Sequence, residues 1–447
     1  MTTMDLAAPA GSWRERIRIT RSGIFSLVFV LLGLWLLLSA PQVAPDTITR
    51  LTAGRQAGLE IAVRPWLLVV GVWYVIAGAP GLLPGNRLQR FHFRAMLLAA
   101  LLLFPTILIL AAAGRSTNAV SMLASSLRLA TPIVIGSMAG IWCERSGVIN
   151  IAIEGMMLTG AAFGFVAFSL IAPSMENSTA LFIGVIISVL AGGVMAMLHA
   201  WLSITFRTDQ IVSGTVINIL ALGLTSFMRR EILLDAQDAG RETLQAVPFE
   251  QIAAFPPLRS LLDQLATLPV FGDFLFPVLE EVFFSGKPIF YMMFVLLLLT
   301  NLILFYTRWG LRTRAVGENP RAADSLGINV IRTRWVNVII AGFIAGLAGA
   351  WLSLETTGTF DDNMSAGRGF IALAAMIFGK WLPFGAFGGG LLFGFSSALE
   401  TRFQILGVTL PPQFLQMTPY IVTIVVLAGL VGRARAPAAI GTPYEKE

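Results

Sequence analysis

Long runs of apolar residues, separated by short polar segments, dominate this chain. Such runs predict membrane-spanning helices, because a helix needs about 20 apolar residues to cross the hydrocarbon core of a bilayer. Backbone groups in lipid must be hydrogen-bonded internally, and runs such as residues 31–38 lack the alternation of a barrel strand. The pattern predicts about twelve spans, at residues 24–40, 66–83, 95–113, 120–142, 148–171, 180–205, 211–228, 288–306, 335–355, 369–382, 386–401 and 415–432.

Composition supports a membrane protein. Hydrophobic residues make up 56% of the 447 positions and charged residues only 13%. The mean hydropathy is +0.78. A soluble domain carries about 25% charged residues. The predicted fold class is therefore all-α: a polytopic inner-membrane helical bundle of about 10–12 transmembrane helices.

The distribution of charge predicts the orientation of the chain. Arg and Lys gather in cytoplasmic loops of membrane proteins. The connection 307–334 carries six arginines, the first 21 residues carry four, and the C-terminal tail is also basic. We expect all three segments, and so both termini, to be cytoplasmic. Residues 229–287 hold nine acidic and five basic side chains, which predicts an external insertion with short amphipathic helices such as 258–268.

Several kinds of chemistry are disfavoured by the sequence. The single cysteine, Cys143, cannot form an intramolecular disulfide. The two histidines lack the spacing of metal ligands, and we assign His199 to capping or packing a helix. No Gly-x-x-x-x-Gly-Lys-Ser/Thr loop is present, because residues 285–288 fail its spacing. The chain therefore has no P-loop ATPase site of its own, and we expect no cofactor and no metal.

A charged and polar string, residues 144–157, interrupts sequence that otherwise suits only lipid. An ionised group at mid-bilayer costs about 2.5 kcal/mol or more unless it faces protein or water. We therefore expect Glu144, Arg145 and Glu154 to face a cavity, to pair with each other or to lie at an interface.

The same string contains a helix-breaking step at Ser146 and Gly147. If the helix resumes directly after it, Asn150 and Glu154 lie one turn apart on the same face. Two interpretations stay open. One is a binding or gating site at an interrupted helix, as in many transporters. The other is an interfacial turn in which Arg145 and a glutamate form a salt bridge between two helices.

The basic connection between the eighth and ninth predicted spans contains a short helix. Asn319 is a good N-cap, Pro320 suits the first helical position, and Gly327 is placed to end the helix in the left-handed conformation. A helix of two turns is marginal alone. It needs a partner surface, which Arg321 and Asp324 would contact, although an ordinary loop helix explains the local signals equally well.

Three weaker features complete the list of candidates. Asn218 lies in an apolar helix and needs a hydrogen-bond partner, either another helix or a substrate. Asp361 and Asp362 form a pair that a cation could use, but no further carboxylate stands at ligand spacing, which favours a solvated turn. Glycines four residues apart, 342 with 346 and 390 with 394, favour close packing of helices.

Taken together, these segments resemble a known family. Residues 144–150 with 154–157 resemble the signature of permease subunits of bacterial ATP-binding-cassette (ABC) importers for nucleosides and simple sugars. That branch belongs to the ribose and branched-chain amino-acid permease superfamily. Residues 317–323 with 327–329 resemble its cytoplasmic coupling loop, and further similarity lies at 209–214 with Asn218, at 367–374, at 419–420 and at 435–444. The similarity covers roughly residues 120–444.

The resemblance implies a division of the chain and a set of partners. Residues 1–118 would be an N-terminal extension of membrane helices and 119–447 the permease core, with an insertion at about 229–287. A cytoplasmic ABC ATPase, a second permease subunit (the same chain or a different one) and an external substrate-binding lipoprotein would complete the importer in the bacterial inner membrane.

The resemblance also implies two groups of functional residues. The short cytoplasmic helix would dock on the ATPase and transmit its closure through Gly317, Glu318, Asn319, Pro320, Arg321, Ala322, Asp324 and Gly327. The path of a nucleoside or simple sugar would be lined or gated by Glu144, Arg145, Asn150, Glu154 and Asn218.

Two other classes remain as alternatives. An ion-coupled secondary transporter needs intramembrane carboxylates for its ion, and Glu144 and Glu154 are the candidates. A membrane-embedded transferase needs a carboxylate or metal cluster at the interface, for which Asp361 and Asp362 alone are too little.

Overall fold

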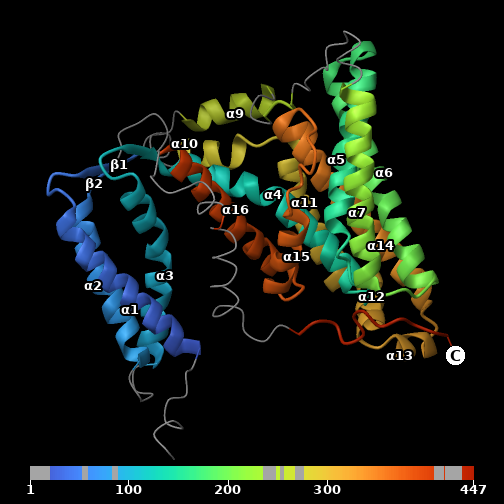
Figure 1. Cartoon of the computed structure of the whole chain (residues 1–447), viewed down its shortest axis with the longest axis horizontal. Helices are drawn as coiled ribbons and strands as arrows, with labels where there is room; N and C mark the ends of the chain where they lie inside the picture. Colours follow the sequence, from blue (N-terminus) through green and yellow to red (C-terminus); the bar gives the residue numbers. More distant parts are fainter. Residues whose placement is uncertain are drawn as a thin grey trace, which may run out of the picture. The chain divides into compact units, whose positions relative to one another are not determined.

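The computed structural model describes residues 21–52, 59–82, 89–234, 248–251, 256–266, 276–406, 417 and 435–446 (Figure 1). Apart from Met417, the predicted span at 415–432 lies outside these residues. The chain divides into two compact units. Unit 1 comprises residues 1–118 with 425–430, and unit 2 comprises residues 119–424 with 431–447.

Unit 1 contains three helices and a small sheet. The helices are α1 (Arg21–Ser39, followed by the short helix η2, Ala40–Gln42), α2 (Val63–Leu82) and α3 (Gln89–Ala111). Helices α1 and α2 pack closely, because a Cβ placed on Gly33 would lie 2.7 Å from the carbonyl oxygen of Gly71. Phe29 meets Tyr74 edge to face across this contact, with ring centroids 5.2 Å apart.

The sheet of unit 1 is not predicted by the sequence analysis. It consists of β1 (Ile48–Thr52), β2 (Leu59–Ala62) and β3 (Ser116–Asn118), in the order β2-β1-β3. β1 pairs antiparallel with β2 and parallel with β3, so that Arg50 stands opposite Glu60 on one side and Ser116 on the other. These strands have only three to five residues each, so the alternation of polar and apolar residues along them is too short to indicate a strand.

The regular elements among the described residues of unit 2 are all helices. Its elements, in chain order, are α4 (Ala119–Glu144), α5 (Ile153–Ile171), η3 (Ala172–Ser174), α6 (Asn177–Ala200), η4 (Trp201–Thr205), α7 (Gln210–Met228), η5 (Arg229–Leu234), α9 (Pro256–Ala266), α10 (Phe276–Leu279), η8 (Glu280–Phe284), α11 (Pro288–Tyr306), α12 (Arg308–Glu318), α13 (Pro320–Ser325), α14 (Val330–Ala350), η9 (Trp351–Thr357), α15 (Arg368–Phe378) and α16 (Pro383–Ile405).

Helix α4 lies at the centre of unit 2. It packs against α11, α14, α15 and α16, and every residue from 130 to 144 is buried. Glycines allow the closest helix contacts. A Cβ on Gly346 of α14 would lie 2.3 Å from the Ser188 carbonyl oxygen of α6, and one on Gly394 of α16 would lie 2.3 Å from the Ser126 carbonyl oxygen of α4. The predicted packing role of these glycines is confirmed.

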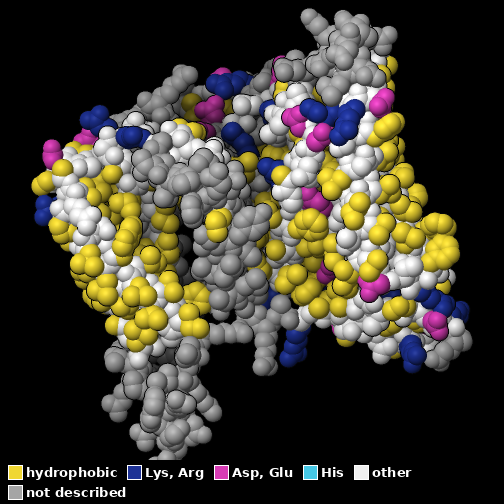
Figure 2. Space-filling view, in the orientation of Figure 1, with side chains coloured by type: hydrophobic (Ala, Val, Ile, Leu, Met, Phe, Trp, Pro, Cys, Tyr) yellow, Lys and Arg dark blue, Asp and Glu magenta, His cyan; other side chains and the backbone are white. Residues whose placement is uncertain are grey.

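Among the described residues, eight helices are long and apolar enough to cross a membrane, so the chain is a multi-pass, all-α membrane protein. Further helices stand at three other predicted spans. Two of them, α3 and α16, are long, whereas α15 has 11 residues, so the predicted crossing at 369–382 is too short to span alone. In Figure 2, hydrophobic side chains cover the middle of the face that carries α6 and α7, and charged side chains gather toward its ends.

Candidate functional site

The polar string forms a crossover between α4 and α5 that is not helical. Helix α4 ends at Glu144, residues 145–147 turn with Gly147 at φ +90°, residues 148–150 are without regular structure, and α5 begins at Ile153. The predicted break at Gly147 is confirmed. The prediction that Asn150 and Glu154 share a helix face is wrong, because Asn150 precedes the helix.

Side chains from α6 and α7 stabilise the non-helical conformation of this crossover by binding its backbone. The Gln210 side-chain oxygen accepts from the N–H of Ile149 at 2.7 Å, and His199 Nε2 lies 2.9 Å from the Ile149 carbonyl oxygen. Buried backbone groups outside a helix need such partners. The described position of His199 agrees with the packing role expected for it, since it is fully buried between two helices.

Glu154 lies in the first turn of α5 and caps a second helix, α15. Its carboxylate accepts hydrogen bonds from the Ser365 hydroxyl at 2.6 Å, the Gly367 N–H at 2.7 Å and the Gly369 N–H at 2.6 Å. The N-terminus of a helix carries partial positive charge and unpaired N–H groups, both of which stabilise a carboxylate. Glu154 is only 7% exposed, so the chain itself offsets this charge.

Asn218 of α7 binds the start of α5 with both ends of its amide. Its oxygen accepts from the Gly155 N–H at 2.8 Å, and its nitrogen donates to the Ile151 carbonyl at 3.0 Å. The predicted partner is therefore a neighbouring helix. Glu154 and Asn218 nevertheless line one cavity of about 380 Å³, together with Thr215 and Phe370.

Glu144 and Arg145 attach the end of α4 to the connection between α15 and α16. The Trp381 indole N–H donates to the Glu144 carboxylate at 2.6 Å, and Arg145 Nε and Nη2 donate to the Trp381 carbonyl at 3.1 and 2.9 Å. Among the described residues, Arg145 forms no ion pair, so the structure does not contain the Arg145–glutamate salt bridge of the alternative interpretation.

Trp381 is a functional candidate that the sequence analysis missed. It and Lys380 have φ values of +55° and +56°, a strained conformation for residues with a side chain. In this conformation the Trp381 ring lies against Glu144, to which its indole N–H donates. Asn150 is also unusual, because it is 0% exposed and its side-chain oxygen has no hydrogen-bond partner among the described residues.

The predicted cytoplasmic helix is present as α13. The Asn319 side chain accepts from the Ala322 N–H at 3.1 Å as an N-cap, and Gly327 ends the turn at φ +80°. Arg321 is exposed and Leu326 is 81% exposed, whereas Ala323 is buried against the rest of unit 2. The role of this helix in coupling stays a prediction.

Residue Gly317, at the end of α12, lies directly against the crossover. A Cβ on Gly317 would lie 2.2 Å from the carbonyl oxygen of Arg145. The loop that leads into α13 and the turn that ends α4 are therefore in backbone contact.

Residues 435–446, which we call the C-terminal strap, bind both of these segments. The Ala439 N–H donates to the Gly317 carbonyl at 2.9 Å, and the Gly441 N–H donates to the Gly147 carbonyl at 3.1 Å. The Ala438 N–H donates to the Glu318 carboxylate at 3.2 Å. The strap thus connects the α12–α13 loop to the crossover.

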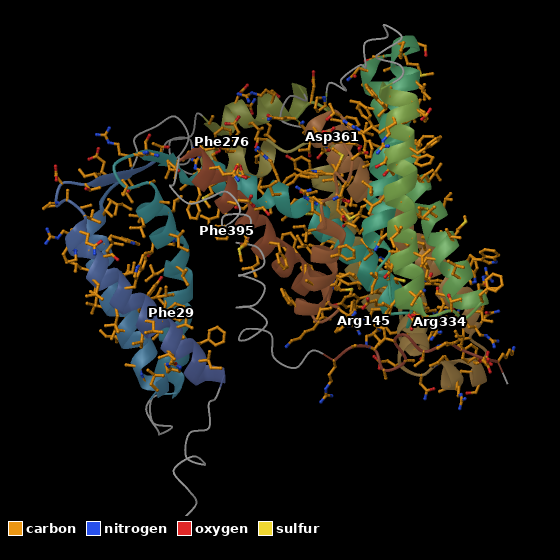
Figure 3. All side chains as sticks on the ribbon, viewed as in Figure 1. Phe29, Arg145, Phe276, Arg334, Asp361 and Phe395 are labelled. Carbon is orange, nitrogen blue, oxygen red and sulfur yellow. The ribbon has the colours of Figure 1, made fainter. Side chains whose placement is uncertain are left out.

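Arg334 of α14 binds the C-terminal strap and the crossover. Its Nε donates to the Ser146 carbonyl at 3.2 Å and its Nη1 to the Thr442 carbonyl at 3.0 Å. Arg334 is 2% exposed. The sequence analysis counted Arg334 only as a cytoplasmic loop charge. Figure 3 shows Arg145 and Arg334 at one end of unit 2 and Asp361 at the other.

At that other end, the aspartate pair is engaged by an arginine. Arg229 forms ion pairs with Asp361 at 3.1 Å and with Asp362 at 3.5 Å. Among the described residues, no group of three or more His, Cys, Asp or Glu side chains could hold a metal ion.

A bundle of apolar helices with a buried polar crossover and a short exposed helix nearby is the arrangement expected of a membrane permease. The chain belongs to the family described as branched-chain amino acid transport system / permease component, whose sequence model matches residues 122–435. The chain is thus a transport component, and membership implies ATPase and substrate-binding partners in general.

Three relatives indicate the branch of the family. The guanosine ABC transporter permease protein NupQ of Bacillus subtilis is 38% identical over 72% of this chain and 95% of its own length. The nucleoside ABC transporter permease protein NupC of Lactococcus lactis is 38% identical over 73% of this chain and 96% of its own length. A putative glucose ABC transporter permease of Haloferax volcanii is 30% identical over 74% and 98%. No solved structure matches the chain.

Proposed function

We propose that this chain is the permease subunit of an ATP-driven importer of nucleosides. The names of the two relatives that are 38% identical, for guanosine and for nucleosides, support this substrate class. A cytoplasmic ABC ATPase supplies the energy, an external lipoprotein delivers the nucleoside, and a second permease subunit, identical or different, completes the path through the inner membrane.

The backbone contact between Gly317 and Arg145 carries this proposal. Helix α13 is too short to be stable alone and exposes Leu326 to 81%, which suits a surface that a partner covers. A displacement of α13 would pass to the crossover through the end of α12, because a Cβ on Gly317 would lie 2.2 Å from the Arg145 carbonyl oxygen. From the crossover the displacement passes to Glu154 and the start of α15.

In this mechanism the five pathway residues have different tasks. Glu154 and Asn218 line the cavity and hold the starts of α5 and α15, so they act as the gate. Glu144 and Arg145 fix the end of α4 to Trp381. Asn150 provides an unpaired buried acceptor that can gain a partner when the crossover shifts. Two discrete arrangements of packed elements are what a transport cycle needs.

An ion-coupled transporter is less well supported. Such a protein needs a carboxylate that is available to bind the ion. The Glu154 carboxylate already accepts three hydrogen bonds at 2.6–2.7 Å from the residues that begin α15. Glu144 is 5% exposed and accepts from Trp381.

The test is nucleoside uptake by the assembled importer in proteoliposomes. Radiolabelled guanosine is added on the side of the binding protein, and ATP on the side of the ATPase. Arg321→Glu should abolish ATP-driven uptake while the complex still assembles, since it reverses a charge on the exposed side of α13. Arg115→Glu, which reverses the charge of an exposed arginine between α3 and β3, should retain uptake. Normal uptake by Arg321→Glu would refute the coupling role, and gradient-driven uptake by this chain alone would favour the ion-coupled alternative.

A further inference from the structure

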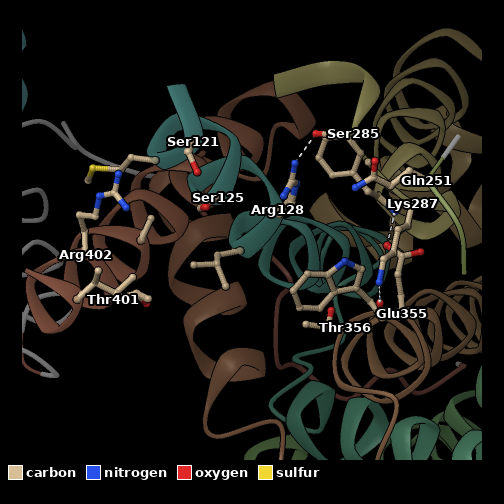
Figure 4. Close-up of a pocket in the computed structure, with 17 residues that line it drawn as sticks. Ser121, Ser125, Arg128, Gln251, Ser285, Lys287, Glu355, Thr356, Thr401 and Arg402 are labelled. Carbon is tan, nitrogen blue, oxygen red and sulfur yellow. Dashed lines mark hydrogen bonds between the residues drawn. The ribbon is translucent and has the colours of Figure 1, made fainter. Parts of the chain in front are cut away.

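A second cavity lies at the end of unit 2 opposite the C-terminal strap. It has a volume of about 370 Å³ and is enclosed by the first third of α4, the start of α11, the end of α14 with η9, and the end of α16. Helix α4 ends and α14 begins at the strap, so these elements meet at the opposite, external end. We call this cavity the external pocket (Figure 4).

Glu355 builds the wall of the external pocket and does not face a ligand. Its carboxylate accepts from the Ile289 N–H at 2.5 Å and the Phe290 N–H at 3.1 Å, so it caps α11. Lys287 donates to the Glu355 backbone carbonyl at 2.6 Å. Burial lowers the pKa of the Lys287 ammonium from its usual value, and the nearby Glu355 carboxylate opposes this effect. With Glu355 engaged, the remaining charged side chains of the lining are cationic.

Arg128 is the cation best placed to read a ligand. It lies on α4, is partly buried, and its Nη2 donates to the Ser285 hydroxyl and, at 3.2 Å, to the Glu281 carbonyl. A guanidinium has five N–H donors in a planar fork. No hydrogen bond joins Nε or Nη1 of Arg128 to any described residue, so part of the fork remains available along the pocket wall.

Apart from these cations, the lining combines apolar side chains with a few hydroxyl groups. Two aromatic side chains, Trp351 and Phe290, line the pocket, and the hydroxyl groups of Ser125 and Thr401 add donors and acceptors. Pockets for small molecules combine apolar walls with a few polar groups that fix orientation. Aromatic side chains favour a nucleobase, whereas they offer nothing to a free phosphate ion.

The hydrogen-bond code of the bases decides which nucleoside fits Arg128. An arginine fork pairs with two adjacent acceptors, the O6 and N7 atoms of a guanine-type base. Adenine places an amino group where guanine has O6, so it meets the fork with a donor. A glutamine instead pairs with the N6 and N7 atoms of adenine.

We propose that the external pocket receives the nucleoside before it crosses, and that Arg128 selects 6-oxopurine nucleosides such as guanosine and inosine over adenosine. This inference rests on the proposed function, since it assigns the site at which the importer reads its substrate.

Thiol protection tests occupancy of the pocket. Cys143 is the only cysteine and is 0% exposed, so Ser125→Cys introduces the one accessible thiol of the chain. In the assembled importer, guanosine should slow the reaction of this thiol with a membrane-impermeant maleimide, and adenosine should slow it less. Ser174→Cys, on the exposed turn after α5, should react at the same rate with and without guanosine. Protection of Ser125→Cys by inorganic phosphate and not by guanosine would mark an anion site and overturn the proposal.

Substrate preference tests Arg128. The ratio of guanosine to adenosine uptake should fall about tenfold or more in Arg128→Gln, and Arg128→Lys, which keeps the charge without the fork, should also lose discrimination. Arg229→Gln, outside the pocket, should leave the ratio unchanged. Guanosine uptake by the wild-type importer with no protection of Ser125→Cys, or with an unchanged ratio in both Arg128 variants, would refute this inference alone. Absence of any nucleoside uptake by the wild-type importer would instead refute the proposed function.

Discussion

At Gly317 the structure has no room for a methyl group. A Cβ there would lie 2.2 Å from the Arg145 carbonyl oxygen and 3.3 Å from the Gly147 nitrogen. Overpacking of this kind costs about 1–3 kcal/mol. We expect Gly317→Ala to displace the end of α12 from the crossover and to reduce ATP-driven nucleoside uptake about tenfold, since a step whose free energy rises by about 1.4 kcal/mol slows tenfold.

Gly388 of α16 provides the matched control for this substitution. No atom lies within 4 Å of a Cβ placed on Gly388, so Gly388→Ala adds the same methyl group without a clash. Both variants should be present in the membrane at wild-type amounts. Equal uptake by the two variants would show that the Gly317 contact does not transmit motion.

The carboxylate of Glu154 makes a separate prediction about stability. In Glu154→Gln, an NH2 group replaces either the oxygen that accepts from Gly367 or the oxygen that accepts from Gly369, and it faces that N–H donor. Hydrogen bonds to a charged group contribute about 1.5–3 kcal/mol, so we expect a loss of that order in the free energy of unfolding. Thermal unfolding in detergent measures it, with Glu176→Gln at an exposed position as the control. Equal unfolding temperatures for the two variants would exclude a capping role for Glu154.

Single residues explain what the sequence could and could not predict about this site. Glu154 and Asn218 stand out because polar side chains in apolar runs need partners. Their partners are not visible, since Ser365 and Gly367 lie more than 200 positions away from Glu154 and carry no special signal. The interpretation of Asn150 as helical is wrong because side chains of α6 and α7 bind the crossover backbone, which a local pattern cannot show.

Among the elements, the C-terminal strap is the one whose function is most open to test. It donates backbone hydrogen bonds to the Gly317 and Gly147 carbonyls, and so ties the α12–α13 loop to the crossover. Removal of residues 436–447 should weaken the connection between the α12–α13 loop and the crossover, because the Gly317–Arg145 contact then joins them without the hydrogen bonds of the strap. The assembled complex should then hydrolyse ATP at a rate that no longer rises with the loaded binding protein, and uptake should fall below detection.

A shorter truncation controls for the loss of the terminus itself. Removal of residues 445–447 deletes Glu445, which pairs with Arg207 at the surface, and leaves every contact of the strap with Gly317, Gly147 and Arg334. This variant should transport normally. Stimulated ATP hydrolysis by the longer truncation would show that the strap is only packing.

Elements with local signals are the ones that the sequence predicts well. Helix α13 is fixed by its own residues, Asn319 as the cap and Gly327 as the terminator, and it appears within one residue of its predicted position. Helix α15 is different. It begins within one residue of the predicted start but ends at Phe378, because Lys380 and Trp381 adopt positive φ, which the apolar run at 369–382 does not indicate.

On the scale of the whole molecule, the described residues of unit 2 place different tasks at opposite ends. The strap, α13 and the crossover meet at the end marked by Arg145 and Arg334, and the external pocket and the Arg229 ion pairs lie at the end marked by Asp361 (Figure 3). In the proposed importer, an ATPase and a delivered substrate would act on this unit from opposite ends. This arrangement requires the strap end to be cytoplasmic.

That orientation is tested by two single cysteines at opposite ends of unit 2. Ser174 lies in the exposed turn η3 after α5, and Ser325 lies at the exposed end of α13. The native chain should give no background, because Cys143 is 0% exposed. In intact cells, a membrane-impermeant maleimide should label Ser174→Cys and not Ser325→Cys, and permeabilised cells should show both. Labelling of Ser325→Cys from outside would put α13 and the strap on the wrong side for a cytoplasmic ATPase, and no arrangement of partners could then drive the crossover as proposed.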